Sequence, residues 1–255
     1  MIRPATALAV LAATLLLAGC PSTAPVVRKN ADPLAIAAWH GQPRAVAAVV
    51  YMKSADPAGN SVQATLNVWR AADGRTRLLL TKIDVDVLSA LIQPTGDFAA
   101  FAPRSGLRTE GALSDPKLPA GFADLRLLLD EVCDGPLAPD LATRPGNHGN
   151  VIEATAGGFT ATITVDPASD EVREKVLRDA QGRLAYQVRY SLYKAFDDLH
   201  RPTKVEVIVG DGSSVVAYLR RFDALGDISA ERMRFTIPDT AREVPAAEFL
   251  EHLDQ

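Results

Sequence analysis

The chain has 255 residues, and its 27 lysines and arginines stand against 31 aspartates and glutamates, which gives a formal net charge of −4. This mildly acidic balance, without a basic patch, argues against nucleic acid as a partner. Hydrophobic residues make up 47% of the chain, which is enough for the core of one large β domain or of two small ones.

The first twenty residues have the pattern of an export signal. Arg3 supplies a positively charged start, and the apolar run over 5–18 is too short for a membrane-spanning helix, which needs about 20 residues. The run ends in Leu17-Ala18-Gly19-Cys20, which resembles the lipobox of bacterial lipoproteins. The alternative is an ordinary secretion signal in which the cysteine stands by chance.

The lipobox resemblance implies cleavage before Cys20 and attachment of lipid to its sulfur. Residues 1–19 are then the signal peptide, and residues 20–31 are the lipid anchor and a flexible tether rich in Ser, Thr, Pro and Val. Pro21 stands where an aspartate retains enterobacterial lipoproteins in the inner membrane. The resemblance therefore favours a lipid-anchored protein of the bacterial cell envelope, at the outer membrane and facing the periplasm.

A single domain is expected over 32–255, and it begins with a helix and a strand. Asp32-Pro33 is typical of a helix start, so a short helix is predicted over 34–39. Residues 44–53 are rich in Val and Ala and are predicted to be the first strand, with a helix as the alternative.

The stretch 61–103 predicts a meander of antiparallel strands. In 62–70, apolar residues alternate with Gln, Thr and Asn, and this period of two turns one face of a strand toward a core. Asp73-Gly74 is typical of a hairpin turn, because such a turn needs a positive φ. The further strands of the meander are predicted over 75–82, 84–92 and 97–103.

The middle of the chain is predicted to hold a short strand over 107–112, a helix over 121–133 and a long loop over 134–150. The helix is amphipathic, with Asp130 and Glu131 on its polar face. Its apolar stripe comprises Phe122, Leu125, Leu128, Leu129 and Val132. The stripe fits two interpretations equally, a helix that closes the core and a lid over a cavity. The loop resembles an insertion, and long loops are uncommon in compact domains unless they are functional.

The second half of the chain predicts more hairpins. Strands are predicted over 152–156, 159–166, 171–179, 183–193, 203–209, 213–222 and 232–237, and a helix over 245–253. With these strands joined mostly by hairpins, the expected fold is mainly β with a few helices (α+β), built on one large curled antiparallel sheet. The concave face of such a sheet must be filled by helices or by a ligand.

This order of elements resembles the Lol family, which comprises the periplasmic lipoprotein carrier and the outer-membrane lipoprotein receptor of Gram-negative bacteria. The most suggestive segments are 64–70 with its continuation to 103, 201–207 and 233–238. The resemblance implies an open, unclosed β-barrel covered by helices, with acyl chains in its apolar cavity. Mycobacterial lipid-binding lipoproteins share this architecture. The receptor's exposed hydrophobic loop residue and the carrier's lid-locking arginine have no clear equivalent in this sequence.

The resemblance implies a membrane-anchored periplasmic lipoprotein that binds the acyl chains of a lipid or an acylated protein, for lipoprotein sorting or lipid transfer to the outer membrane. Its partners would be that ligand, the membrane through Cys20, and other envelope proteins. The alternative is a structural or scaffold lipoprotein that makes protein contacts. The sequence leaves open which strand face points inward. The residues expected to line the cavity are Leu66, Val68, Phe98, Phe122, Leu125, Leu129, Phe159, Ile163, Tyr186, Val188 and Tyr190.

Neither a catalytic nor a metal site is indicated. The four histidines, at 40, 148, 200 and 252, are scattered without the spacing of a metal site or a catalytic triad. Cys133 is interpreted as a small buried hydrophobe. We therefore expect no enzyme activity, no metal and no cofactor, and a hydrolase with an undisplayed site is the weakest hypothesis. The acidic pairs are interpreted as solvated residues: Asp84/Asp86, Asp130/Glu131 and Asp197/Asp198.

Overall fold

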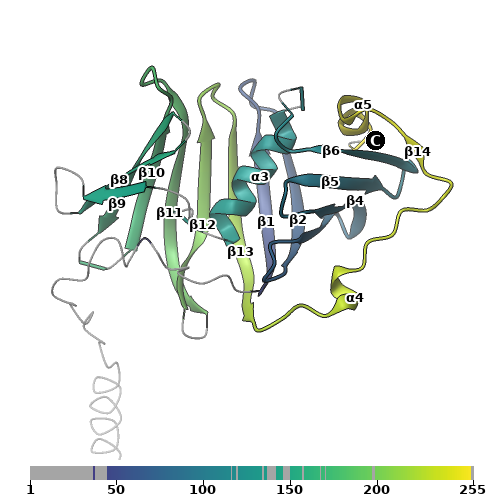
Figure 1. The fold of residues 1–255 in the computed structure, drawn as a ribbon, viewed down its shortest axis with the longest axis horizontal. Coiled ribbons are helices and arrows are strands. Elements are labelled where there is room, and N and C mark those ends of the chain that lie inside the picture. Colours follow the sequence, from purple (N-terminus) through teal and green to yellow (C-terminus); the bar gives the residue numbers. More distant parts are fainter. Residues whose placement is uncertain are drawn as a thin grey trace, which may run out of the picture. The chain divides into compact units, whose positions relative to one another are not determined.

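The computed structural model divides the chain into two compact units, Met1–Asn30 and Ala31–Gln255. The second unit is built on one sheet (Figure 1). The side chains of 120–126, 142–145 and 156 are not described. The residues that the structure describes are 37, 45–115, 117–118, 120–133, 135–136, 142–145, 150–156, 158–166, 168–169, 171–196 and 199–253.

Fourteen strands among the described residues form the sheet, and three helices accompany them. The helices are α3 (Ala120–Cys133), α4 (Ala230–Met233) and α5 (Ala246–Glu251). The strands of the first half are β1 (Ala45–Ala55), β2 (Ser61–Arg70), β3 (Thr76–Lys82), β4 (Val85–Ile92), β5 (Asp97–Ala102) and β6 (Leu107–Ala112). The strands of the second half are β7 (Ala142–Pro145), β8 (Val151–Ala156), β9 (Phe159–Asp166), β10 (Glu171–Arg178), β11 (Leu184–Phe196), β12 (Leu199–Val209), β13 (Ser214–Leu225) and β14 (Arg242–Glu243).

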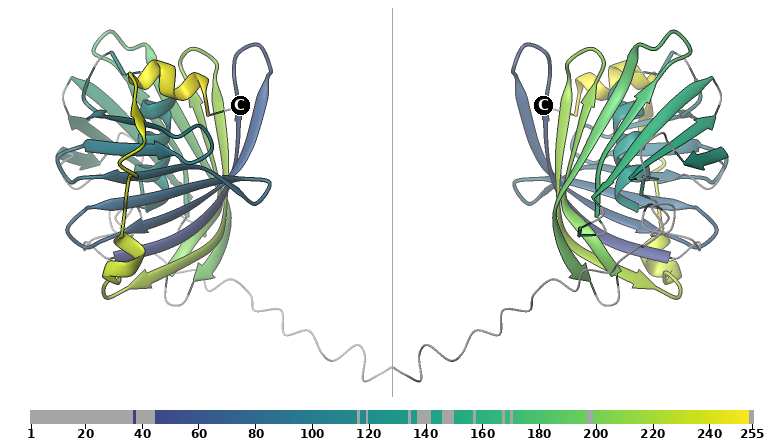
Figure 2. Two further views of the ribbon diagram at one scale, coloured as in Figure 1. Left: turned by 90° about the vertical axis from the view of Figure 1, so that its right-hand side faces the viewer. Right: turned by 90° about the vertical axis from the view of Figure 1, so that its left-hand side faces the viewer.

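The order of strands in the sheet is β14-β6-β5-β4-β3-β2-β1-β13-β12-β11-β10-β9-β8-β7. Strand β1 pairs with both β2 and β13, so it joins the two halves of the chain at the centre of the sheet. All pairs are antiparallel except the two-residue pairing of β14 with β6. Strands β14 and β7 lie at the two ends of this order, and the sheet curls without closing (Figure 2). The predicted open half-barrel is therefore confirmed.

The strands form where the sequence alternates and turn where it supplies a positive φ. In β2, Ala64, Leu66 and Val68 are buried while the residues between them are only partly covered. Gly74 turns the chain after β2 with φ 88°. Such short turns keep consecutive strands adjacent, which explains why the sheet order follows the sequence through most of each half.

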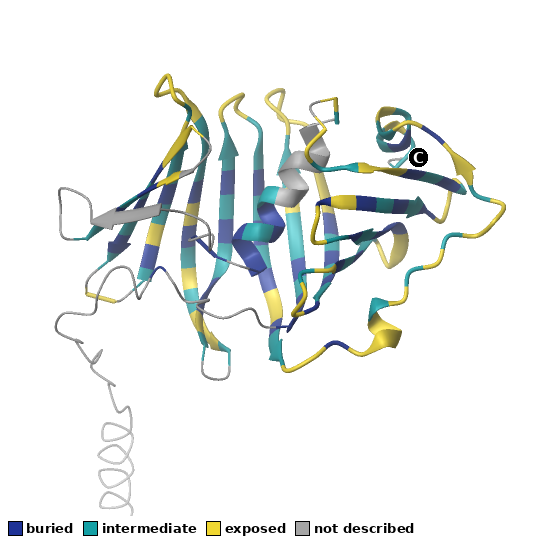
Figure 3. Cartoon of the chain, in the orientation of Figure 1, coloured by how far each residue is buried: buried dark blue, intermediate teal, exposed yellow. Residues whose placement is uncertain are grey.

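The core lies on the concave face of the sheet. Buried residues of one parity from the strands pack together there with one face of α3 and with Phe249 of α5. Helix α3 lies across the middle of the sheet (Figure 1), and burial alternates along the strands that surround it (Figure 3). The interior is therefore filled from two sides, by the sheet and by helices.

The predicted strand over 232–237 is wrong. Residues up to Met233 belong to α4, whose N-cap Ser229 accepts a hydrogen bond from the backbone N–H of Arg232, and the segment that follows has no regular structure. Of the residues of the predicted strand, Met233 packs instead against a small cluster on the convex face, formed by Ala45, Ala47 and Ile228. The alternating pattern thus belongs to a strap laid over the sheet, and not to a strand.

The sheet differs from the prediction in two smaller ways. It has two strands beyond the twelve predicted over 44–222: β7, which falls inside the predicted long loop, and β14, which is only two residues long. Strands β11, β12 and β13 extend beyond their predicted bounds. The helix predicted over 34–39 lies outside the described residues apart from Ala37, which is helical and buried. The helices predicted over 121–133 and 245–253 are present as α3 and α5.

Candidate functional site

Most of the residues expected to line a cavity lie together on the concave face. Tyr186 is partly buried against the same cluster. The backbone of Phe122 and Leu125 lies in α3, but their side chains are outside the described residues. The fully buried members of the set are Leu66, Val68, Phe98, Leu129, Ile163, Val188 and Tyr190. The structure thus settles the inward parity that the sequence left open.

Phe159 does not join this group. It is the first residue of β9, next to the turn at Gly158, and it is 42% exposed. It has the same parity as Ile163, which is buried further along the strand. The strand end extends past the core, so parity alone does not bury the side chain.

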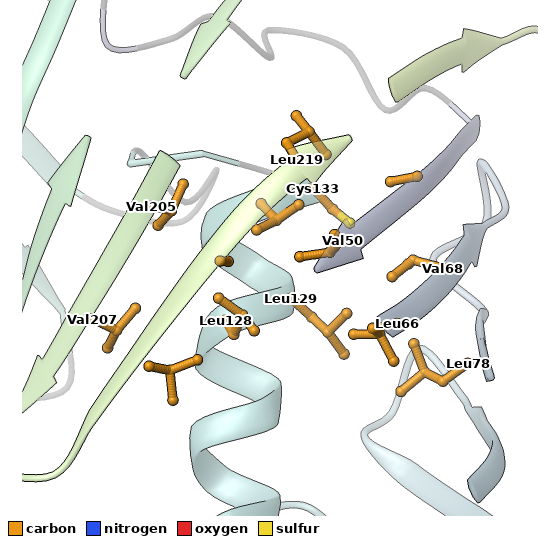
Figure 4. Close-up of a cluster of buried hydrophobic side chains, with 14 of the residues drawn as sticks. Val50, Leu66, Val68, Leu78, Leu128, Leu129, Cys133, Val205, Val207 and Leu219 are labelled. Atoms are coloured by element: carbon orange, nitrogen blue, oxygen red, sulfur yellow. The ribbon is translucent and has the colours of Figure 1, made fainter. Parts of the chain in front are cut away.

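Helix α3 covers the concave face with apolar side chains. Leu128, Leu129 and Cys133 are buried, and Figure 4 shows them facing Val50 of β1 and Leu66 of β2. The burial of Cys133 agrees with its interpretation as a small hydrophobe. In this conformation, the helix occupies the place that a ligand of the concave face would take.

Little empty space is left between α3 and the sheet at the best-defined pocket on this face. The pocket has a volume of about 10 Å³ and is lined by Glu131 and Val132 of α3 and by residues of β12 and β13. A cavity of that size holds about one water molecule. At this point the space between α3 and the sheet is too small for an acyl chain.

A buried polar network joins α3 to the sheet within this apolar surface. Glu131 is only 1% exposed, so its interpretation as a solvated residue is wrong. One carboxylate oxygen lies 2.5 Å from Nζ of Lys175 on β10, and the other accepts a hydrogen bond of 2.5 Å from the hydroxyl of Tyr190 on β11. The ammonium of Lys175 also lies 5.7 Å from the ring centroid of Tyr186. The network therefore consists of one carboxylate from α3 and its donors from two strands.

Burial and pairing shift the pKa values of this network. Burial raises the pKa of the Glu131 carboxyl, and the attraction of Lys175 offsets this only in part. Burial alone would lower the pKa of Lys175, but the Glu131 carboxylate and Tyr186 outweigh it, so the pKa of Lys175 is raised. Burial and the neighbouring carboxylate also raise the pKa of Tyr190 well above its ordinary value. Lys175 is therefore a cation at neutral pH.

A second buried cation lies beside the same pocket. Arg201 of β12 is 2% exposed and lines the pocket together with Glu131. Its guanidinium carbon lies 3.7 Å from the ring centroid of Phe222 on β13, which is a close cation–π contact. Sequence analysis did not single out Lys175 or Arg201, because only the folded sheet brings them beneath α3.

The tip of the β3–β4 hairpin presents a hydrophobic residue to solvent. Ile83 is 91% exposed, and it and Asp84 form the two-residue turn with φ values of 52° and 59°. A β-branched residue at positive φ is strained, because its side chain crowds the backbone. The sequence signal was weak, since Ile83-Asp84 lacks the Asn or Gly typical of such a turn.

None of the helices among the described residues is long and apolar enough to cross a membrane. No group of three or more His, Cys, Asp or Glu side chains in that part of the chain is arranged to hold a metal ion.

Solved structures with the same fold are known. A LolA superfamily protein of Nitrosomonas europaea superposes with a TM-score of 0.58 at 14% identity, over 81% of this chain and 99% of that protein. An outer membrane lipoprotein-sorting protein domain of Vibrio parahaemolyticus gives 0.54 at 13% identity, over 78% and 93%. A DUF1329 family protein of Desulfovibrio piger gives 0.55 at 13% identity, over 79% and 94%.

These likenesses are confined to structure. No protein-family model matches the sequence, and no curated protein matches it. At identities this low the superpositions establish the fold, and the resemblance to the Lol superfamily is confirmed at that level.

Proposed function

We propose that this chain is a membrane-anchored envelope lipoprotein that binds the acyl chains of a lipid or an acylated protein on the concave face of its half-barrel, in lipoprotein sorting or lipid transfer to the outer membrane. The proposal includes no catalytic step and no cofactor. The single observation that carries it is the continuous apolar concave face, covered at its centre by one amphipathic helix, α3. The fold shared with a lipoprotein-sorting domain supports it.

Acyl chains would bind by replacing α3. Leu128, Leu129 and Val132 contribute apolar surface to the sheet that an acyl chain can supply equally well. Apolar burial is worth about 25 cal/mol per Å² in either case, so the exchange of helix for ligand is nearly balanced in free energy. A carrier needs such a balance, because it must both load and release its ligand.

Two features outside the concave face fit a role at a membrane. The lipobox resemblance places an anchor at Cys20. Ile83, at the tip of the β3–β4 hairpin, is a candidate for the exposed hydrophobic loop residue of the family's receptor. An exposed apolar side chain held at a strained turn gains free energy from contact with lipid, which would offset part of the cost of the turn.

The acyl-binding function is tested by measuring the lipid content of the protein without its proposed anchor. The chain from Pro21, which keeps the compact unit Ala31–Gln255, should carry or take up lipid, as detected by native mass spectrometry and organic extraction. Ile163→Trp should weaken uptake by filling the concave face. Thr164→Trp, on the opposite face of the same strand, is the matched control.

The result that would contradict the proposal is equally direct. If the chain from Pro21 contains no lipid and ignores both lipids and acylated peptides, the acyl-binding function fails. The scaffold function, in which the sheet makes protein contacts at the envelope, then takes its place.

A further inference from the structure

Charged side chains are buried under α3, where apolar ones would close the core equally well. Among the described residues, the buried charged side chains are Glu131, Lys175 and Arg201. Exchanging a buried ion pair for well-packed apolar residues is often neutral or stabilising. A gain in stability when α3 covers the sheet therefore does not explain why Glu131 and Lys175 form a buried ion pair.

The network divides unequally between helix and sheet. Helix α3 supplies the carboxylate, and the sheet supplies the Lys175 ammonium and the Tyr190 hydroxyl, each 2.5 Å from one carboxylate oxygen. If α3 leaves, the donors stay behind on an apolar face. The Arg201 guanidinium lines the pocket that Glu131 also lines, so a second cation lies beside the same spot.

This donor set has a defined chemical preference. Ammonium, guanidinium and phenol hydroxyl groups donate hydrogen bonds, and in a poorly solvated site they bind carboxylate or phosphate oxygens most strongly. A neutral head group would leave the Lys175 cation without a counter-charge in apolar surroundings, which is costly. The face therefore discriminates against neutral amphiphiles.

We infer that Lys175 and Tyr190, with Arg201 beside them, form a head-group site for an anionic acyl lipid. In the structure, α3 occupies this site in place of the ligand. Leu128 and Leu129 lie where the acyl chains would bind, and the Glu131 carboxylate lies where the anionic head group would bind. This inference rests on the proposed acyl-binding function and adds the chemical class of the ligand. The anion is a carboxylate or a phosphate attached to an acyl chain.

The test compares ligands that differ only in their charge, with the chain from Pro21. Palmitic acid is paired with hexadecanol, and palmitoyl lysophosphatidic acid with monopalmitoylglycerol. The wild-type protein should bind the charged member of at least one pair about tenfold more tightly or better, as expected for a charge-assisted hydrogen bond. The pair that shows the preference identifies the anion as carboxylate or phosphate.

Three variants test which residues cause the preference for the charged ligand. Glu131→Gln removes the competing carboxylate and should increase the preference for the charged ligand. The double variant Glu131→Gln with Lys175→Met removes both charges of the buried ion pair together, so it should fold, and its preference should fall to a ratio near one. Lys204→Met, on the opposite face of the sheet beside Glu206, is the control and should keep the wild-type ratio.

The outcomes separate this inference from the function on which it rests. If the wild-type protein binds charged and neutral ligands equally, or if the double variant keeps the wild-type ratio, the head-group site is refuted and acyl binding stands. If the wild-type protein binds none of the four ligands, both fail. Circular dichroism of each variant confirms that the comparison is made between folded proteins.

Discussion

Ile83 is a β-branched residue whose backbone lies in the left-handed region. A β-branched residue at φ 52° costs on the order of 1–3 kcal/mol, and its side chain gains nothing from the core because it is almost fully exposed. Such strain at a solvent-exposed tip is what a site of contact with another surface would show. The strain at Ile83 is unfavourable for stability, and it fits the membrane contact proposed for this hairpin.

Ile83→Asn should stabilise the fold. Asparagine tolerates the left-handed region, so the free energy of unfolding should rise by about 1 kcal/mol in a urea titration. Val62→Asn changes an exposed strand residue without positive φ, and should give no comparable gain. A lower stability of the Ile83 variant than of wild type would show that the turn is not strained in the way described.

The burial and the contacts of individual side chains were the hardest features to predict from sequence. The lining residues Leu66 and Ile163 were identified because alternation marks one face of a strand, although only the fold shows which face points inward. Glu131 was misinterpreted because its neighbour Asp130 and the helix periodicity indicate a polar face. Its partners Lys175 and Tyr190 lie 44 and 59 residues away along the chain, so no local pattern could reveal the pairing.

At the scale of elements, local signals were strong where hairpins are short. Strands β2, β3 and β5 follow turns in which a glycine supplies the required positive φ, and both their existence and their order were predicted. The strap after β13 shows the limit. Its alternating residues satisfy a strand pattern, but Met233 packs against Ala45 and Ile228 on the convex face. A tertiary contact of this kind has no local signature.

Helix α3 is the element whose movement the proposed function requires. Cys133 at its end is buried, and it is the only cysteine in the chain from Pro21. A thiol reagent should therefore modify one site in the denatured protein and react slowly in the native one. Binding of an acyl lipid should increase the rate of Cys133 modification in the native protein about tenfold or more, because displacement of α3 exposes the thiol.

The alternative for this element is equally measurable. If the rate of Cys133 modification is the same with and without a bound lipid, α3 stays seated on the sheet. The lipid would then bind elsewhere, and α3 would serve only to close the core.

At the scale of the whole molecule, we propose separate tasks for an anchor at Cys20 and for the half-barrel. The Leu17-Ala18-Gly19-Cys20 pattern predicts lipidation, so Cys20→Ser should move the protein from the membrane fraction to the soluble fraction of the periplasm. Cys133→Ser, which changes the other cysteine, should leave it with the membrane. Fractionation of the Cys20 variant with the membrane would argue against a lipid anchor at that residue.

The three solved structures compared above share the fold at 13–14% identity. A shared half-barrel therefore establishes the architecture, while the occupant must be derived from the side chains that line it. In this chain those are an apolar concave face, a helix that covers it and a buried group of donors. Together they lead to the central claim that acyl chains bind where α3 now lies.

The most direct test of this claim is to locate a bound acyl chain by photo-crosslinking. A palmitate with a diazirine near its terminal methyl group is bound to the chain from Pro21, irradiated, and mapped by mass spectrometry of peptides. We expect cross-links on inward residues such as Leu66, Ile163 and Val188. Cross-links confined to outward residues of the same strands, such as Asn67 and Thr164, would contradict the claim.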